Sequence, residues 1–325
     1  MQEGHYDAAR QAASEELLLL EQQQSMPVEQ ETSTLLTTFD NRSTTRIQRI
    51  LTGDPVDLGR AYRRLGDIAC TVGLRSEGLA HLHTALSIYE RYNYKREIAH
   101  VSCNLSYNYF KKGEHRLARE ILQRAFNLAE SMHDDPLLSV VYSDLAAFAA
   151  AAGAHEEAER WYKRALELAE HTNDREYLSR WNAALALSLE QQDKLKEASD
   201  CAVYALKIGR ATHKNPCIGE ALVALGNLRL LQANEVVPLP TKRPRMRSHL
   251  LKQARKLLTC AIALNGVEAE TKTRAQILLS RVSLASTELQ QARTEAAQAL
   301  AMARDYELAQ EEALALELQQ QLAIQ

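Results

Sequence analysis

The ionisable residues of this 325-residue chain fall into none of the spacings that commonly support catalysis. No GxxxxGK[ST] loop could hold a nucleotide, no GxSxG elbow could present a serine nucleophile, and no HExxH pair could bind zinc. The nearest histidine pair, His81 and His83, is two residues apart, so on a helix the two rings point to different faces. The acidic residues are scattered and indicate solvated helix faces. We therefore predict no catalytic residue, no metal site and no cofactor.

The cysteines and the hydropathy pattern favour a cytoplasmic protein. No two of the five cysteines form the close pair that structural zinc needs, and their number is odd. We interpret them as reduced core thiols, because disulfides are rare in the cytosol. No uncharged apolar stretch reaches the roughly 18 residues of a membrane span, and the N-terminus lacks the pattern of a secretory signal. The cysteines are Cys70, Cys103, Cys201, Cys217 and Cys260.

One short segment is rich in positive charge. Lys242, Arg243, Arg245 and Arg247 follow two prolines in the stretch 236–247. Such a run can contact nucleic acid, an acidic protein or a nucleotide. The alternative is a solvated loop with polyproline character. We favour this alternative, because no aromatic residues are interleaved for base stacking and the whole chain has a net charge of -3.

The elements that carry these residues are predicted to be helices. The composition is 46% hydrophobic and 25% charged, with only 12 glycines and 7 prolines. Ala, Leu, Glu, Gln and Arg dominate, and these residues lose little side-chain freedom in a helix. The composition therefore predicts an all-α fold.

A repeat with a period of 40 residues organises these helices. A leucine column is followed at the next position by small residues, an alanine column recurs in the same phase, and turn residues keep the same period. In order, these sets are Leu65, Leu105, Leu145, Leu185 and Leu225; Gly66, Ser106, Ala146, Ala186 and Gly226; Ala85, Ala125, Ala165 and Ala205; and Gly73, Gly113, Gly153 and Asp193. Repeats of this length indicate a solenoid.

Each unit is predicted to be a pair of amphipathic helices. In the second unit, apolar residues recur every three or four positions over 97–111 and again over 116–132, with Gly113 as the break between them. Asp134 and Asp135 before Pro136 then predict the start of the next helix.

These columns resemble the tetratricopeptide repeat, whose pattern is aromatic-x2-Leu-Gly-x2-Tyr followed by Ala-x3-Phe. The resemblance rests on Tyr62, Leu65 and Gly66; on Leu105, Ser106, Tyr109, Ala118, Leu122 and Ala125; and on Tyr142, Leu145, Ala146, Ala158, Tyr162 and Ala165. It implies a right-handed superhelix of antiparallel helix pairs. The period of 40 rather than 34 makes the chain similar to the sensor arms of large signal-transduction ATPases and to the peptide-sensing domains of quorum-sensing regulators.

The period divides the chain into five segments. The first looks like the second half of a repeat, so it is either a partial repeat of a longer protein or an N-terminal capping helix. The segments are 1–24; an irregular segment at 25–56; four regular repeats and the first helix of a fifth at 57–234; the basic insertion at 235–249; and the second helix of the fifth repeat, a sixth repeat and a capping helix at 250–325.

The resemblance also implies a binding surface, because the first helix of each tetratricopeptide unit lines the concave face. Tyr107 and Phe110 have a second interpretation, in which they pack against the next repeat. The side chains expected on the concave face are Arg60, Arg63, Asp67, His100, Asn104, Tyr107, Phe110, Arg180, Leu187 and Asn227.

We predict a non-catalytic binding domain. The favoured hypothesis is the ligand- or peptide-sensing arm of a larger regulator, either a signal-transduction ATPase or a transcription regulator, with a protein, peptide or small-molecule effector in the concave groove. The alternatives are a general protein-protein scaffold and a nucleic-acid contact through the basic insertion.

Overall fold

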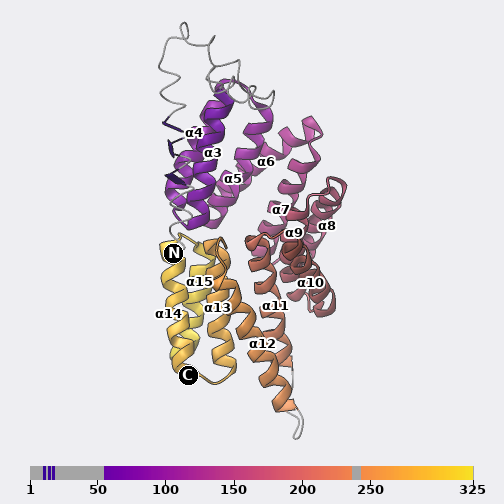
Figure 1. Cartoon of the computed structure of the whole chain (residues 1–325), viewed down its shortest axis with the longest axis vertical. Helices are drawn as coiled ribbons and strands as arrows, with labels where there is room; N and C mark the ends of the chain where they lie inside the picture. Colours follow the sequence, from indigo (N-terminus) through magenta and orange to yellow (C-terminus); the bar gives the residue numbers. More distant parts are fainter. Residues whose placement is uncertain (1–9, 12–13, 16, 19–54, 236–242, 325) are drawn as a thin grey trace, which may run out of the picture.

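The computed structural model is a stack of antiparallel helix pairs (Figure 1). It describes residues 10–11, 14–15, 17–18, 55–235 and 243–324. Within the last two ranges the chain forms helices and turns without a strand, which confirms the predicted all-α fold. The helices are α3 (Pro55–Val72), α4 (Arg75–Arg91), α5 (Lys95–Lys111), α6 (His115–Met132), α7 (Asp135–Ala151), α8 (His155–His171), α9 (Arg175–Glu190), α10 (Leu195–Ala211), α11 (Asn215–Glu235), α12 (Arg243–Ala263), α13 (Ala269–Ala285), α14 (Leu289–Asp305) and α15 (Ala309–Ile324).

Left-handed residues end the helices of the regular repeats. The predicted turn positions Gly73, Gly113 and Gly153 have φ of 98°, 85° and 79°, and Asp193 has φ of 60°. A second column lies between the repeats, with φ from 51° to 55° at Asn93, His133, Asn173 and His213. A left-handed residue after the last helical turn lets the next backbone N–H bond back to the helix. Every turn of α3 to α10 therefore has the same geometry.

Consecutive helices approach closely where the small-residue column meets large side chains of the second helix. A Cβ added at Gly66 would come within 2.7 Å of Leu82 Cγ, and one at Gly226 within 2.7 Å of Leu258 Cγ. Ser106 uses the same closeness to donate a 2.7 Å hydrogen bond to the Ala118 carbonyl. The alanine column is fully buried: Ala85, Ala125, Ala165 and Ala205.

The helix start predicted at Asp134 is confirmed. Its carboxylate caps α7 by accepting a 3.1 Å hydrogen bond from the Leu137 N–H, and Pro136 lies in the first turn. Asp174 caps α9 in the same way, accepting from the N–H groups of Glu176 and Tyr177 at 3.1 Å.

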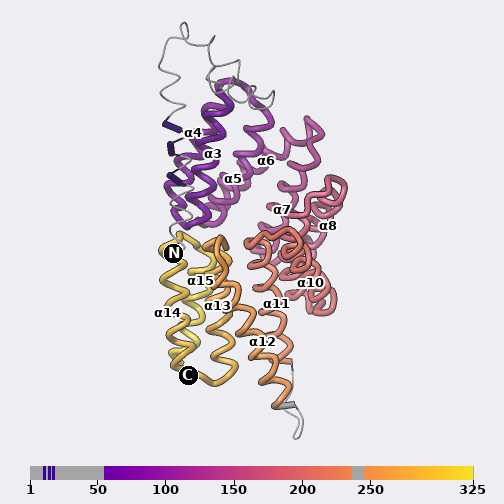
Figure 2. The backbone as a smooth tube through the Cα atoms, in the orientation of Figure 1, coloured from indigo at the N-terminus to yellow at the C-terminus, as the bar shows by residue number. Residues whose placement is uncertain are grey.

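The fifth unit has the longest helices, α11 and α12, whose ends form the lower tip of the molecule in Figure 2. Residues 243–249, predicted as part of a loop-like insertion, form the first turns of α12 instead. The rest of the predicted insertion, 236–242, lies outside the described residues. Most of the segments predicted at 1–24 and 25–56 lies outside them too, and Pro55 and Val56 begin α3.

The array turns far enough that its first repeats rest end-on against its last ones (Figure 1). The α3–α4 turn meets the α14–α15 turn, where Arg75 Nε donates to the Tyr306 carbonyl at 3.4 Å and the Ser76 hydroxyl lies 2.8 Å from the Glu307 carboxylate. A Cβ added at Gly73 would lie 2.1 Å from the Tyr306 ring, so only glycine permits this approach. We call the contact between α3–α5 and α13–α15 the closure contact.

Two further features bear on the sequence predictions. No helix among the described residues is long and apolar enough to span a membrane. All five cysteines are unpaired, and Cys103 and Cys217 are buried. Cys260 is exposed on α12, so the prediction that all five are core thiols is wrong for this residue.

Candidate binding site

The odd-numbered helices of the array face a common centre, because charged side chains join helices that are far apart in sequence. Lys111 of α5 lies 2.7 Å from Glu270 of α13, and the Tyr107 hydroxyl donates to the same carboxylate at 2.8 Å. Arg180 of α9 pairs with Glu268, the residue that precedes α13, at 2.8 Å. The start of α13 therefore lies at the centre of the superhelix.

We call the ionisable side chains gathered there the central charge cluster. Arg180 also pairs with Glu220 of α11 at 3.1 Å, and Arg274 bridges Glu270 and Glu311, each at 2.9 Å. The cluster comprises three cations and five carboxyl groups: Lys111, Arg180 and Arg274, with Asp144, Glu220, Glu268, Glu270 and Glu311.

The cluster is deep but not sealed. The side chains of Lys111 and Glu270 are 4% and 9% exposed, whereas those of Arg180 and Arg274 keep 31% and 35% of their surface open to solvent. Buried ion pairs contribute little net stability, because desolvation offsets most of their attraction. So many ionisable groups at one centre therefore favour a role in recognition, and the two arginines are the accessible part.

Burial and neighbouring cations shift the pKa values of the acidic groups in opposite directions. Burial alone would raise the pKa of the Glu270 carboxyl, but Lys111 and Arg274 hold it well below its usual range. Burial raises the pKa of Glu220 to about 7, although Arg180 opposes the shift. The carboxyl groups of one cluster thus differ in protonation at neutral pH.

Asp144 is the least satisfied member of the cluster. It lies on α7, its residue surface is 7% exposed, and its Oδ2 atom has no hydrogen-bond partner among the described residues, as is also true of Glu311 Oε2. Burial raises the pKa of its carboxyl to about 8, against the effect of Lys111 and Arg180. A buried polar atom without a partner is unfavourable, so Asp144 is a position where a ligand donor would be stabilised.

Five of the predicted concave residues gather on α3 and α5, close to one another. Asp67 accepts hydrogen bonds from Arg63 at 3.0 Å and from Asn104 at 2.6 Å, and burial raises its pKa to about 6. Arg60 pairs with Asp57 at 3.2 Å. Burial, with Arg63 and Arg96 nearby, lowers the pKa of His100 to about 4. We call Arg60, Arg63, Asp67, His100 and Asn104 the N-terminal polar group.

The remaining predicted residues are distributed over three environments. Tyr107 and Arg180 belong to the centre described above. Phe110 is buried and stacks on Phe148 with ring centroids 4.2 Å apart, so it packs between α5 and α7. Leu187 packs partly against the core around α9, and Asn227 donates to the Glu190 carboxylate at 2.5 Å.

The basic residues singled out from the sequence lie on a different part of the molecule. Arg247 donates to the Ala285 carbonyl at the end of α13 at 2.8 Å, and Arg245 is exposed. Arg243 begins α12, and Lys242 lies outside the described residues. Neither Arg245 nor Arg247 is joined by an ion pair or a hydrogen bond to a described member of the central charge cluster.

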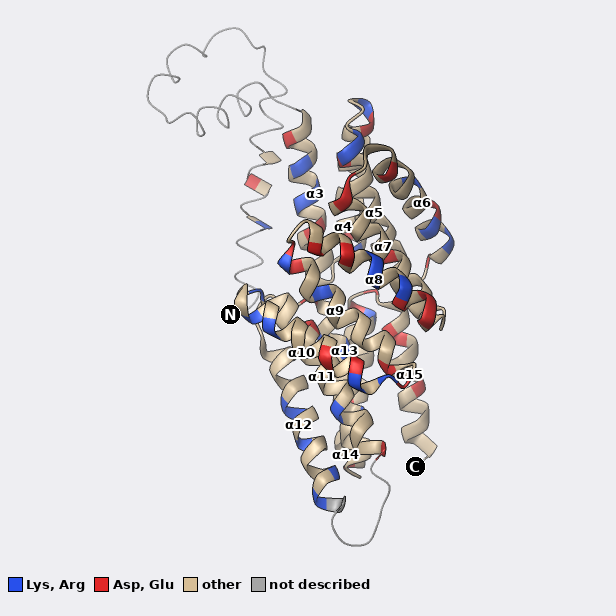
Figure 3. Ribbon diagram, turned by 90° about the vertical axis from the view of Figure 1, so that its right-hand side faces the viewer, with Lys and Arg blue, Asp and Glu red and all other residues tan. Residues whose placement is uncertain are grey.

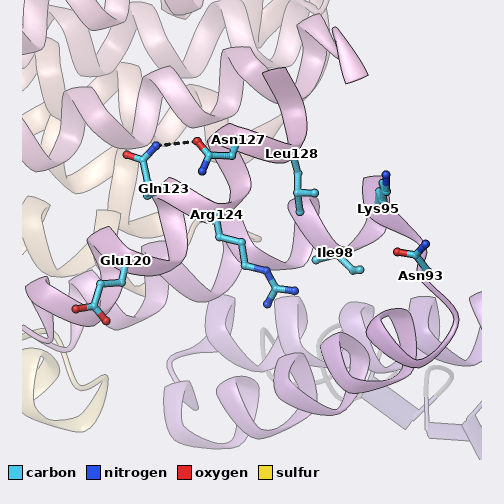
Figure 4. A pocket seen from close by; sticks show the side chains of 8 residues that line it. All are labelled: Asn93, Lys95, Ile98, Glu120, Gln123, Arg124, Asn127 and Leu128. Atoms are coloured by element: carbon cyan, nitrogen blue, oxygen red, sulfur yellow. Dashed lines mark hydrogen bonds between the residues drawn. The ribbon is translucent and has the colours of Figure 1, made fainter. Parts of the chain in front are cut away.

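A shallow cavity of about 480 Å³ lies between the start of α5 and one face of α6 (Figure 4). Its apolar lining, Ile98 and Leu128, occupies repeat positions that recur as Leu138 and Leu168. Arg124, which also lines it, is paired with Glu90 at 2.6 Å. The cavity therefore follows from the general packing of the repeat.

Sequence reasoning found Arg180 but missed the other charged members of the centre, and the expectation that acidic residues lie on solvated helix faces is wrong for Glu270 and Glu311, which are buried. Lys111 stands one helical turn after Tyr107, so it shares the face on which Tyr107 was predicted to lie. Asp144 precedes a run of apolar residues in the middle of a helix, which is itself an unusual place for a carboxylate. Glu270 and Arg274 pair with each other within α13, but they gave no signal of a central position because their other partners, Lys111 and Glu311, are far away in the sequence.

Comparisons with known proteins agree with this architecture. Residues 57–131, which span α3 to α6, match the family model described as tetratricopeptide repeat. No curated protein matches the sequence. The fold is therefore a tetratricopeptide-like α-solenoid.

Solved structures of the same fold cover most of the chain. Aspartyl phosphate phosphatase F from Bacillus subtilis aligns with a TM-score of 0.56 at 12% identity, over 90% of this chain and 72% of that one. A Rap protein complexed with competence and sporulation factor aligns at 0.50 and 14%, over 87% and 69%. A signal transduction ATPase with numerous domains and a tetratricopeptide repeat sensor, from Pyrococcus horikoshii, aligns at 0.51 and 14%, over 97% of this chain and 49% of that one. These likenesses concern the fold.

Proposed function

We propose that this chain is the sensor arm of a cytoplasmic regulatory protein, and that it binds a short peptide or small effector at the central charge cluster without catalysis. The observation that carries the proposal is the unpartnered Oδ2 atom of Asp144 in the same cluster as Arg180, a cation that acts on Asp144 and is partly open to solvent. Binding groups placed on rigid helices and left incompletely satisfied are typical of a preformed ligand site.

The charge balance of the cluster supports a ligand that carries a positive group. Five carboxyl groups face three cations, and the raised pKa values of Asp144 and Glu220 mark the two carboxyl groups that these cations do not fully neutralise. A ligand amine or guanidinium would favour their ionised forms and complete the pairing. Arg180 is available for a ligand carbonyl or carboxylate, since part of its surface is open. A short peptide offers both kinds of group.

The closure contact gives such a ligand a means of signalling. A ligand held between α5, α7, α9 and α13 would tie the first repeats to the last ones, and so change the equilibrium between open and closed arrays. Two proteins that share the fold are consistent with this role, because one is a Rap protein complexed with competence and sporulation factor and the other has a repeat sensor.

The proposal is tested with two pools of random pentapeptides, one with lysine and one with glutamate at the central position. Affinity selection on the full chain should enrich peptides from the lysine pool, and calorimetry should then measure the best of them. Asp144→Asn and Arg180→Gln should each weaken binding about tenfold, which is about 1.4 kcal/mol.

Glu167→Gln serves as the control, because Glu167 is exposed on α8. Equal affinities for this variant, the wild type and Asp144→Asn would contradict the assigned site. Enrichment from the glutamate pool would contradict the charge argument.

A further inference from the structure

Helix α12 is the most unevenly charged helix among the described ones. It carries six Lys or Arg residues and no Asp or Glu over its 21 residues. The whole chain has a net charge of -3, so this helix runs against the overall balance. Figure 3 shows the resulting blue segments along α12.

The cations of α12 divide between two faces. Arg247 and Arg255 point toward the neighbouring helices, where Arg255 pairs with Glu288 at 2.6 Å and with Glu295 at 3.4 Å. Arg245, Lys252 and Lys256 are exposed, and no ion pair or hydrogen bond joins them to another described residue. We call these three residues and His249, which is also exposed, the basic stripe.

The basic stripe is straight. Its members stand at i, i+4, i+7 and i+11, a spacing that places side chains along one face of a helix over about 16 Å. Within the stripe, Lys252 and Lys256 are like charges at i and i+4, which repel each other and weaken a helix. The stripe thus has an unfavourable effect on the folding of α12 by itself.

The start of α12 is unfavourable for a second reason. Its first turn contains Arg245 and no acidic residue, although the helix dipole favours negative groups there. Helix α8 shows the usual arrangement, with Glu156 and Glu157 in its first turn. These placements of charge weaken the helix and no contact inside the described fold compensates for them, which indicates a functional surface.

We propose that the basic stripe is the docking surface for an acidic helix of a partner protein. Charge complementarity identifies the partner, because the three exposed cations of the stripe, with the His249 ring in line between them, match a row of carboxylates on a helix laid alongside. Met246 is 58% exposed next to the stripe and offers an apolar contact, which a protein helix can use. Helix α12 contains no Phe, Tyr or Trp side chain on which a nucleic-acid base could stack.

The surface is distinct from the proposed effector site. None of the described residues of the stripe belongs to the central charge cluster. The ends of α11 and α12 form one tip of the molecule (Figure 1), so a partner can reach this surface while the centre is occupied.

The test uses the full chain and a fluorescein-labelled helical peptide with glutamates at i, i+4, i+7 and i+11. The same peptide with glutamines and a short DNA duplex are the comparison probes. Fluorescence anisotropy should show binding of the glutamate peptide that weakens as salt increases. Tighter binding of the DNA or equal binding of the glutamine peptide would overturn the proposal.

A matched pair of double variants separates the stripe from net charge. Arg245→Glu with Lys256→Glu reverses two exposed cations on α12, and Lys196→Glu with Lys207→Glu reverses two exposed cations at the same separation on α10. The first variant should lose about tenfold in affinity or more, and the second should bind like the wild type. An equal loss in both, or no binding of the peptide by the wild type at low salt, would refute the docking surface.

A stability measurement guards against misfolding as the cause. Arg245→Glu alone should raise the melting temperature slightly, because it places an anion in the first turn of α12. A variant that melts higher and binds more weakly can have lost affinity only through the surface. A lower melting temperature together with unchanged binding would count against the proposal.

Discussion

The contacts between consecutive repeats and the closure contact between the first and last repeats are made of different side chains. Consecutive repeats meet through alanine, leucine and small residues, as where Ala165 is fully buried. The first and last repeats meet through charged and polar groups such as Lys111 and Glu270. Apolar packing is roughly proportional to buried area and tolerant of direction, whereas a buried ion pair is specific in geometry and small in net energy. The apolar contacts therefore stabilise the array along its length. The closure contact adds little net free energy and instead determines the curvature of the array.

The largest effect that separates the two kinds of contact is expected for Glu270→Ala. It leaves the Lys111 ammonium buried without its carboxylate and should destabilise the protein by about 3–5 kcal/mol. Urea unfolding measures the loss. Small-angle X-ray scattering gives a second readout, because opening of the closure contact would hydrate Lys111 and expand the particle. A variant with unchanged stability and unchanged radius would show that the contact does not close the array.

Gly73→Ala tests the closure contact without touching a charge. Alanine in the left-handed region is unfavourable by about 1–2 kcal/mol, and overpacking against Tyr306 should add about 1–3 kcal/mol. Gly153→Ala is the control, because Gly153 is also left-handed but has no atom within 4 Å of an added Cβ. Thermal unfolding should show the larger loss at Gly73, and equal losses would contradict the contact with Tyr306.

Ala165→Leu probes the apolar interface instead. Ala165 is fully buried and its carbonyl accepts a 2.6 Å hydrogen bond from Ser139. The added side chain should overpack the site and lower the free energy of unfolding by about 1–3 kcal/mol. Denaturant unfolding should register this loss without a change in particle radius at native conditions. Expansion of the folded particle would mean that the two kinds of contact are not independent.

A pH series sharpens the electrostatic side of the comparison through Asp144→Asn. The folded pKa of Asp144 is about 8 and its ordinary value is 3.8, so the folded chain binds the extra proton between these values. The contribution of this group to the free energy of unfolding is fully present below about pH 4 and is lost as the pH rises toward 8, by about 1.4 kcal/mol per pH unit. Between pH 5 and 7, the free energy of unfolding of the variant should therefore fall less steeply with pH than that of the wild type, by this amount. Identical slopes would place the Asp144 pKa near its ordinary value.

The smallest effect is expected for Glu307→Ala. Its partners Lys112 and Ser76 lie at 3.3 Å and 2.8 Å, on side chains that are partly exposed. Exposed pairs contribute about 0–1 kcal/mol, less at high salt. Unfolding at low and high salt should show a small difference that disappears with added salt. A loss as large as that of Glu270→Ala would mean that the edge of the closure contact matters as much as its centre.

The fold could be predicted from the sequence because each repeat carries its own signals. The positions Gly66 and Ala165 fix where helices approach, and Gly113 fixes where they turn, all within one period. Turns at Asn93 and His133 also carry left-handed residues, but Asn and His are weaker signals than glycine.

The centre of the superhelix could be predicted only in part. The face of each first helix was predictable, and Tyr107 and Arg180 do lie at the centre. The closure contact was not, because it results from small rotations summed over several repeats, and each repeat touches only its neighbours. Lys111 and Glu270 are therefore joined by geometry that no local pattern records.

The meeting of Gly73 with Tyr306 also fixes how many units the array can have. Solenoids usually evolve by duplication or loss of whole units, since each added unit only lengthens an open stack. Here one extra unit between α5 and α13 would carry Glu270 past Lys111 and separate the two ends. Substitutions within a unit leave the number of units unchanged, whereas the gain or loss of a unit would produce a protein with a different curvature.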